Sequence, residues 1–325
     1  MKYRNVGKSG LKVSEIALGS WMTNLSSQSD QDIAEETIRV AFDKGINFFD
    51  CADAYSGGEA ERFLGKVLKD YDRSSYVVSS KVFFPTCPGP NGWGLSRKHI
   101  IENIDRSLKN LGMDYIDLYY CHRFDPTTPM EETLRTLSDL VTQGKILYYG
   151  VSEEWGAARL EKAQTIIREY HLHPMTVLQP QYNMIDRYIE HEIIDVCEEY
   201  GIGITPFSPL AQGLLTGKYK KGEAYPENSR ATHQIDKQVN QLLTDENLDK
   251  VEKLSKIADE LGTTMPVLAL AWILRKKIIS SVITGASKPS QLEGNVAASE
   301  LVIPEDALQK IDEILGFTRF ERHVG

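Results

Sequence analysis

Residues 97–122, RKHIIENIDRSLKNLGMDYIDLYYCH, contain a helix, a turn and a strand, and this unit recurs along the chain. In residues 97–110 the apolar side chains recur every three or four positions, which predicts an amphipathic helix, and Ser96 can cap its start. Residues 116–122 then form a nearly continuous apolar run, which is typical of a strand buried on both faces. The stretch therefore predicts one helix-and-strand unit of an α/β fold.

Seven more strands of this kind are predicted, so the unit occurs eight times. These strands cover residues 15–19, 47–52, 76–82, 147–152, 176–181, 203–207 and 281–285. The other predicted helices cover residues 30–44, 58–69, 129–143, 155–170, 186–200, 247–261 and 266–275. Strands that alternate with helices form parallel sheets, and eight repeats in one chain favour a closed (β/α)8 barrel.

The regions outside the repeat refine this architecture. A doubly wound open sheet is the alternative, but the first strand runs into Gly19-Ser20-Trp21 instead of the usual G-x-G-x-x-G loop. Residues 2–6 and 12–13 predict a hairpin that caps the barrel floor, and residues 211–245 form a long loop of the kind that is usually functional. No linker divides the chain, so we expect one domain over residues 1–325, with extra helices at its C-terminal end.

Composition excludes several classes of partner. The chain has 37 Lys+Arg against 46 Asp+Glu, and a net charge of −9 does not suit a nucleic-acid or anionic-membrane surface. The longest apolar stretch, residues 267–274, is too short for membrane insertion. The absence of an apolar leader and of any C-x-x-C pair predicts a reduced, cytoplasmic setting. No metal site is expected, because the spacing of His171, His173, His191 and His233 matches no ligand motif.

Polar residues at the ends of three consecutive strands predict an active site, since barrel sites lie at the carboxyl ends of the strands. Asp50 and Tyr55 follow the second strand, Lys81 ends the third and His122 ends the fourth. A buried Lys81 needs a carboxylate partner, and Asp50 can supply it. The lysine charge is expected to lower the pKa of Tyr55 from about 10 toward neutral pH. Tyr55 could then donate a proton to a carbonyl oxygen that His122 orients, while hydride reaches the carbon.

The pattern Phe49-Asp50-x-Ala52-x-x-Tyr55, followed by Lys81 and His122, resembles the catalytic tetrad of the aldo-keto reductase superfamily. The resemblance covers nearly the whole chain and is strongest for the potassium-channel β-subunit branch and its bacterial glyceraldehyde-phosphate or methylglyoxal reductase relatives. The segments that carry it are residues 94–102 (GLSRKHIIE), 125–133 (DPTTPMEET), 208–213 (SPLAQG) and 285–287 (GAS).

This resemblance implies a function and an assembly. It implies NADPH-dependent reduction of aldehydes or reactive ketones, with a small-molecule carbonyl compound as substrate. Vertebrate channel subunits replace the fourth-strand histidine, whereas this chain keeps His122, which favours a working reductase. The channel branch also implies a homo-tetramer. Two alternatives remain open: a nucleotide-sensing regulatory subunit with little turnover, and metal-assisted aldol or isomerase chemistry in the same pocket.

The resemblance also implies a groove for NADP(H). Ser20 and Trp21 would flank the nicotinamide and the substrate pocket, Ser152 and Gln179 would hydrogen-bond the carboxamide, and Phe207 would stack on the nicotinamide ring. The remaining implied cofactor residues are Asp50, Ser208, Pro209, Leu210, Ala211, Gln212, Lys218, Arg230, Gly285, Ser287, Lys288, Gln291 and Asn295. A 2′-phosphate would lie near Lys288, at a helix N-terminus.

Three positions depart from the family pattern or allow two interpretations. Glu153 stands where relatives carry Arg or Asn beside the carboxamide. Glu293 is one position away from the acidic residue that relatives place near the adenine. Trp93 could line the mouth of the substrate pocket or pack beneath it.

Overall fold

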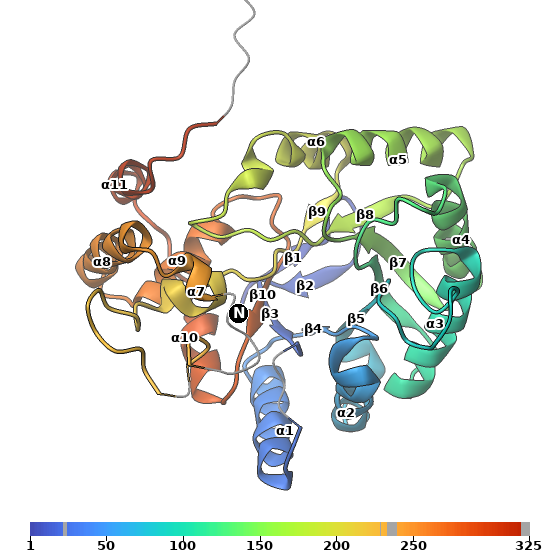
Figure 1. The fold of residues 1–325 in the computed structure, drawn as a ribbon, viewed down its shortest axis with the longest axis horizontal. Coiled ribbons are helices and arrows are strands. Elements are labelled where there is room, and N and C mark those ends of the chain that lie inside the picture. Colours follow the sequence, from blue (N-terminus) through green and yellow to red (C-terminus); the bar gives the residue numbers. More distant parts are fainter. Residues whose placement is uncertain (22–24, 228, 233–238, 320–325) are drawn as a thin grey trace, which may run out of the picture.

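The computed structural model describes residues 1–21, 25–227, 229–232 and 239–319 (Figure 1). Eight parallel strands form one sheet in the order β10-β3-β4-β5-β6-β7-β8-β9. They are β3 (Ile16–Gly19), β4 (Phe48–Asp50), β5 (Val77–Val82), β6 (Ile116–Cys121), β7 (Ile146–Val151), β8 (Met175–Leu178), β9 (Gly203–Ile204) and β10 (Val282–Gly285). Backbone hydrogen bonds link the segment around β9 to the segment around β10. Ser280 N donates to Ile204 O at 2.8 Å, and Ile283 N donates to Pro206 O at 3.0 Å. These bonds join the edges of the sheet, and the predicted (β/α)8 barrel is confirmed.

Helices surround this sheet, as Figure 1 shows. Their bounds are α1 (Gln28–Asp43), α2 (Glu59–Leu68), α3 (Arg97–Leu111), α4 (Met130–Thr142), α5 (Ala157–Glu169), α6 (Ile193–Tyr200), α7 (Val239–Leu242), α8 (Asp245–Glu260), α9 (Met265–Leu274), α10 (Ser290–Ala297) and α11 (Glu305–Leu315). The predicted cap of α3 is present, because the Ser96 hydroxyl accepts from His99 N at 3.3 Å. At the other end Gly112 takes a left-handed φ of 64°, which ends the helix.

The N-terminal hairpin closes the floor of the barrel, as expected. Strands β1 (Tyr3–Asn5) and β2 (Lys12–Ser14) are antiparallel, and both Val6, which follows β1, and Val13, within β2, are fully buried. These two valines pack against interior side chains of the barrel, namely Ala17, Phe48, Val77, Leu118, Tyr120, Val177 and Ile283. An apolar plug therefore fills one end of the barrel and leaves the opposite end for polar groups.

Two predicted elements differ from the structure. The strand expected at residues 203–207 is regular only over Gly203–Ile204, since Pro206 has no amide hydrogen and Phe207 forms a single bridge with Gln181. The helix expected at residues 186–200 begins only at Ile193. Before it, the side chain of Asn183 accepts hydrogen bonds from Ile185 N and Asp186 N, which holds this stretch in a turn.

The sequence predicts neither a membrane-spanning segment nor a metal site. Within the described ranges, no single helix is long and apolar enough to cross a bilayer, and α8 with α9 would qualify only as a pair bent by 88°. The same ranges hold no group of three or more His, Cys, Asp or Glu that could hold a metal ion. His233 lies outside the described residues. The single domain over residues 1–325 stays a prediction.

Candidate active site

Four polar side chains converge at the carboxyl ends of three neighbouring strands. Asp50 ends β4, Lys81 lies in β5 and His122 directly follows β6. Each lies two or four positions after an apolar interior residue of the same strand (Phe48, Val77 or Leu118), so all three face the barrel axis. Tyr55 begins the 3₁₀ turn after β4, and its ring packs edge-on against the His122 ring, with centroids 5.8 Å apart. The structure thus brings together the four residues that the sequence predicts to be catalytic.

Lys81 lies at the centre of this group. Its Nζ donates to Asp50 Oδ2 and to the Cys51 carbonyl oxygen at 2.7 Å each, and to the Tyr55 hydroxyl at 3.2 Å. Lys81 is completely buried, and these three acceptors match its three ammonium protons. Burial by itself would lower the pKa of Lys81, but the charge interactions and hydrogen bonds with Asp50 and Tyr55 together outweigh burial and raise it. Lys81 is therefore a fixed cation.

Asp50 is held by two further donors. Its Oδ1 accepts from Ser79 Oγ at 2.7 Å and from Gln179 Nε2 at 2.9 Å. Register explains the first contact, since Asp50 and Ser79 are directly paired between β4 and β5. With Lys81 on its other oxygen, the Asp50 carboxylate is fully engaged and cannot rotate toward a substrate. Asp50 therefore binds Lys81 and balances the lysine charge.

The expectation for the pKa of Tyr55 is wrong. Burial raises the pKa of Tyr55 to about 12, although the positive charge of Lys81 pulls in the opposite direction. The lysine contact at 3.2 Å therefore offsets part of the burial effect instead of dominating it. Tyr55 consequently holds its proton at neutral pH, which is the form that an acid catalyst requires.

His122 is a neutral imidazole in this site. Burial, together with the positive charges of Lys81 and Arg123, lowers its pKa well below 6.5. Its ring is fixed by the edges of two aromatic neighbours, Tyr55 at 5.8 Å and Phe84 at 4.9 Å between centroids. A neutral histidine can donate one hydrogen bond to a carbonyl oxygen without adding a charge to the pocket.

A cleft of about 1190 Å³ opens over the tetrad at the C-terminal end of the barrel. Sites for one drug-sized ligand have roughly 300–1,000 Å³, so this cleft has room for an extended ligand beside a small one. The expected cofactor residues that line it are Trp21, Asp50, Ser152, Gln179, Phe207, Ser208, Pro209, Leu210, Gln212, Lys218, Arg230, Gly285, Ser287, Gln291 and Asn295.

Three expected cofactor residues lie outside the lining of this cleft. The Ser20 hydroxyl donates to the Asp50 carbonyl oxygen at 2.9 Å, and Ser20 lines a separate cavity of about 80 Å³ between α1 and α2. Ala211 is 2% exposed, so its methyl group packs into the core. Lys288 is exposed beside Ser287, at the outer end of the cleft. Any contact of these three residues with a cofactor would therefore involve their backbone atoms or lie at the edge of the cleft.

The loop after β9 has an unusual backbone. Ser208, Ala211 and Gln212 all take left-handed φ angles, of 50°, 46° and 56°. Non-glycine residues adopt this region rarely, and such strained positions concentrate at ligand-binding loops. Asn183 Nδ2 fixes the start of the loop by donating to the Ser208 carbonyl oxygen at 3.0 Å. The loop is thus held in a shape that turns its backbone toward the cleft.

Comparison with known proteins agrees with this geometry. The sequence profile of the aldo/keto reductase family matches residues 15–316 of the chain. The chain belongs to the aldo/keto reductase family. Three similar proteins are candidate voltage-gated potassium channel subunits beta. The protein of Schizosaccharomyces pombe is 44% identical to this chain, and the match covers 98% of this chain and 94% of the relative. The protein of Arabidopsis thaliana is 43% identical, and that of Oryza sativa subsp. japonica is 40% identical. Each of these two matches covers 97% of this chain and 97% of the relative.

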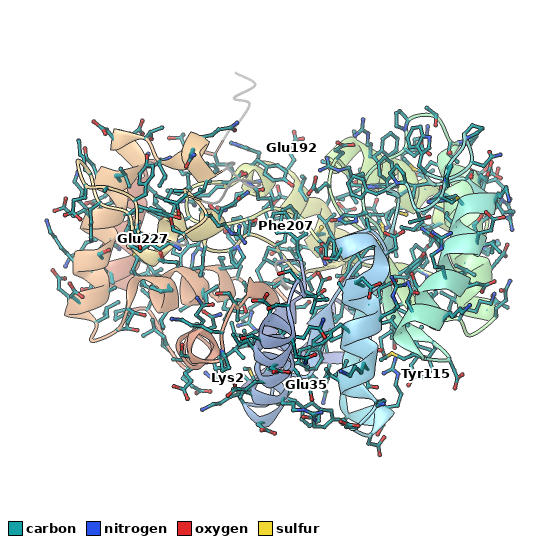
Figure 2. The ribbon with its side chains drawn as sticks, turned by 60° about the horizontal axis from the view of Figure 1, so that its bottom comes forward. Lys2, Glu35, Tyr115, Glu192, Phe207 and Glu227 are labelled. Atoms are coloured by element: carbon teal, nitrogen blue, oxygen red, sulfur yellow. The ribbon has the colours of Figure 1, made fainter. Side chains whose placement is uncertain are left out.

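Members of the aldo/keto reductase family generally use a nicotinamide dinucleotide, and the residues of this cleft fit such a group. Phe207 is half-buried, lines the cleft and lies near the centre of the molecule in Figure 2, so its ring is placed to stack on a flat group. Its amide donates to Pro180 O at 3.0 Å, so its backbone is fixed. Lys218 and Arg230 supply positive charge in the cleft wall, and the Arg230 guanidinium lies 5.3 Å from the Trp21 ring centroid. Aromatic and cationic groups are what a dinucleotide needs.

The two departures from the family pattern, and the position of Trp93, have different outcomes. Glu153 lines the cleft but is bound to Arg123 in an ion pair. Glu293 lies outside the cleft and pairs at 3.2 Å with Lys44, which directly follows α1, so it does not point toward the site. Trp93 is 42% exposed and packs edge-on against Phe83 at 5.9 Å. Trp93 lies outside the lining of the cleft, so packing beneath the mouth describes it better.

Several lining residues were not predicted from the sequence. Phe84, Arg123, Glu154, Asp186 and Tyr188 all line the cleft. Arg123 could have been found, because it follows His122 directly at the carboxyl end of a strand. The other four lie in loops, where no periodicity indicates which way a side chain points.

Proposed function

We propose that this protein reduces aldehydes or reactive ketones to alcohols with NADPH, with Tyr55 as the proton donor. The observation that carries the proposal is the buried contact of Lys81 Nζ with Asp50 at 2.7 Å and with the Tyr55 hydroxyl at 3.2 Å. A phenol beside a fixed ammonium group can release its proton during a reaction, because the ammonium group stabilises the phenolate that forms.

Each tetrad residue has a distinct part in this reaction. A reduced nicotinamide supplies hydride when it is bound. Tyr55 holds a proton at its hydroxyl, since its pKa is about 12, and gives it to the carbonyl oxygen. Lys81 stabilises the resulting phenolate, and Asp50 keeps Lys81 charged and in place. Neutral His122 donates a hydrogen bond to the same carbonyl oxygen and orients the substrate.

NADPH is proposed in preference to NADH. The two cofactors differ by one 2′-phosphate, and a chain of net charge −9 attracts that group only through local cations. Lys288 is exposed directly after Ser287, a residue of the cleft wall, and α10 begins two positions later. An ammonium group beside a helix N-terminus suits a phosphate.

The remaining assignments complete the proposal. The substrate is a small carbonyl compound, and neither nucleic acid nor membrane insertion is involved. We place the protein in the cytoplasm, where NADPH is available, and propose a homo-tetramer by analogy with the channel subunits. The role in aldehyde detoxification follows from the substrate class.

The test is an assay of NADPH oxidation with the purified chain. Methylglyoxal, glyceraldehyde and aromatic aldehydes are supplied in turn, and the alcohol product is identified by mass spectrometry. Turnover of at least one class with one alcohol formed per NADPH supports the proposal. NADPH binding without alcohol formation from any of them contradicts it.

A second candidate function follows from the names of the relatives. A regulatory subunit of the channel β-subunit type would bind the dinucleotide and respond to its redox state with little turnover. The same assay separates the two functions, because a regulatory subunit binds NADPH tightly and leaves every aldehyde unreduced.

A further inference from the structure

Two glutamates bind the only arginine that directly follows a tetrad residue. Arg123 follows His122, and Glu153 and Glu154 follow β7. The Arg123 guanidinium forms an ion pair with Glu153 through Nη2, and its Nη1 lies 3.0 Å from Glu154 Oε1. The side chains of Arg123 and Glu153 are 34% and 28% exposed, so water screens this group only in part. The guanidinium is thus already engaged on two sides by carboxylates.

This group borders the place where a carbonyl substrate would be oriented. The Arg123 guanidinium lies 5.6 Å from the Phe84 ring centroid, and the Phe84 ring packs edge-on against the His122 ring at 4.9 Å. Glu153 N donates to the His122 carbonyl oxygen at 3.2 Å. Phe84, His122, Arg123 and Glu153 all line the cleft. A substrate held by His122 therefore has these charges as neighbours.

A third carboxylate lies on the same side of the cleft. Asp186 lines the cleft and accepts a hydrogen bond from Gln181 Nε2 at 2.7 Å. Burial, together with the negative charges of Asp186 and Glu153, raises the pKa of Tyr188, so both carboxylates act on the same phenol. We call Arg123, Glu153, Glu154 and Asp186 the acidic rim. Three carboxylates against one guanidinium leave this rim with a formal charge of −2.

Other lining residues of the cleft carry positive charge. Lys218 and Arg230, from the loop after β9, are the described cations there. The lining therefore carries charges of both signs, and the acidic rim is the part that adjoins His122. Like charges a few ångströms apart in a partly buried site repel measurably, and a nearby charge of one sign selects the ligands that enter.

We infer that the acidic rim excludes negatively charged carbonyl compounds, so that the substrates are neutral or cationic aldehydes and ketones, with Glu153 as the main specificity-determining residue. The inference rests on the proposed function. The Arg123 charge is largely balanced by the two glutamates, so the guanidinium offers little net attraction to an anionic group. Glu153 has the larger effect, because it is less exposed than Glu154, whose side chain is 50% exposed. The rim takes no part in the chemistry, in which the carbonyl carbon gains hydride from the reduced nicotinamide and the oxygen gains the Tyr55 proton.

The test compares two aldehydes of nearly equal shape, 4-formylbenzoate and 4-formylbenzamide, at low ionic strength with saturating NADPH. The wild type should favour the amide by about tenfold in kcat/KM, as expected for a repulsion of one or two partly screened charges. Glu153→Gln should reduce this ratio by the largest factor, since it halves the net charge of the rim, and Glu154→Gln should reduce it by a smaller factor. Glu153→Asp, which keeps the charge, should retain most of the preference.

A matched control removes one charge far from the cleft. Glu169, at the end of α5, is exposed, and Glu169→Gln should leave the ratio unchanged. A second readout needs no catalysis: the affinities of the two corresponding benzyl alcohols, measured by isothermal titration calorimetry, should show the same preference for the amide. Reduction of both aldehydes at a ratio that Glu153→Gln does not alter would overturn the inference alone. Reduction of neither aldehyde by the wild type would overturn the proposed function and the inference with it.

Discussion

Lys81 Nζ lies 2.7 Å from Asp50 Oδ2, with the lysine side chain fully buried and the aspartate side chain 4% exposed. Strand β4 lies directly beside β5, and the register pairs Asp50 with Ser79, two positions before Lys81. The pair is therefore built into the wall of the barrel, on the same side as the interior apolar residues. Two opposite charges in such a place support each other, and removal of one leaves the other without compensation.

Lys81→Met should consequently lower both activity and stability. The loss of the ammonium group leaves the Asp50 carboxylate buried beside Ser79 and Gln179 alone, which typically costs about 3–5 kcal/mol. Urea denaturation measures the loss, and the double variant Asp50→Asn/Lys81→Met should recover most of it without recovering turnover. A single variant as stable as the wild type would contradict the ion-pair argument.

Tyr55→Phe tests the proton donor. The substitution removes only the hydroxyl that accepts from Lys81, so the fold and the affinity for the cofactor should be retained. General acid catalysis typically contributes about 10²–10⁴-fold, and kcat should fall by a factor in this range. Steady-state kinetics give kcat, and cofactor titration by tryptophan fluorescence gives the affinity. Unchanged kcat would exclude Tyr55 as the acid.

Lys288→Ala tests the preference for NADPH. Hydrogen bonds to charged groups contribute about 1.5–3 kcal/mol, so NADPH binding should weaken by roughly tenfold to a hundredfold. NADH, which lacks the 2′-phosphate, should bind almost as before. Paired titrations with both cofactors measure the difference, and Lys277→Ala, at an exposed lysine before β10, is the matched control. Equal losses for the two cofactors would show that Lys288 does not contact the 2′-phosphate.

Asp53 should make stability depend on pH. Burial and the nearby charge of Glu61 raise the pKa of Asp53 to about 8, from 3.8 for an unperturbed aspartate. Asn103 Nδ2 donates to Oδ2, while Oδ1 has no partner among the described residues. Between pH 4 and pH 8 the folded protein therefore holds a proton that the unfolded chain has released, and the free energy of unfolding falls as the pH rises through this window.

Asp53→Asn removes this linkage, because the amide is neutral at every pH. Relative to wild type, the variant should gain stability steadily between pH 5 and pH 8, by at most about 1.4 kcal/mol for each pH unit. Urea denaturation at several pH values measures the gain, and Asp259→Asn, at an exposed position near the end of α8, should show none. A difference between variant and wild type that is constant over this range would refute the assignment.

Loop conformation explains why some features could not be predicted. The helix expected at residues 186–200 has good apolar spacing, yet the Asn183 side chain takes up the amides of Ile185 and Asp186, and the chain turns there. That turn brings Asp186 and Tyr188 into the cleft wall. Hydrogen bonds between a side chain and its own backbone compete with helix formation, and apolar periodicity does not register them.

The pKa of Tyr55 is a property of the site that could not be predicted from the sequence. Sequence spacing was enough to predict that Asp50, Tyr55 and Lys81 would meet, since strands of one parallel sheet end at one edge. The direction of the pKa shift depends on how deeply the phenol is buried, and burial arises from side chains of several elements. The sequence shows which side chains can carry a charge, whereas the dielectric environment of each charge depends on how the structure packs around it.

The barrel, the hairpin beneath it and the four residues at the strand ends could all be predicted from the sequence, because they follow from the period of apolar residues along each strand and helix. The ion pairs of Glu153 with Arg123, and of Glu293 with Lys44 after α1, are visible only in the folded structure. Ion pairs between distant parts of the chain depend on where loops and helix faces meet in space. That placement results from packing over the whole molecule, and local sequence does not encode it.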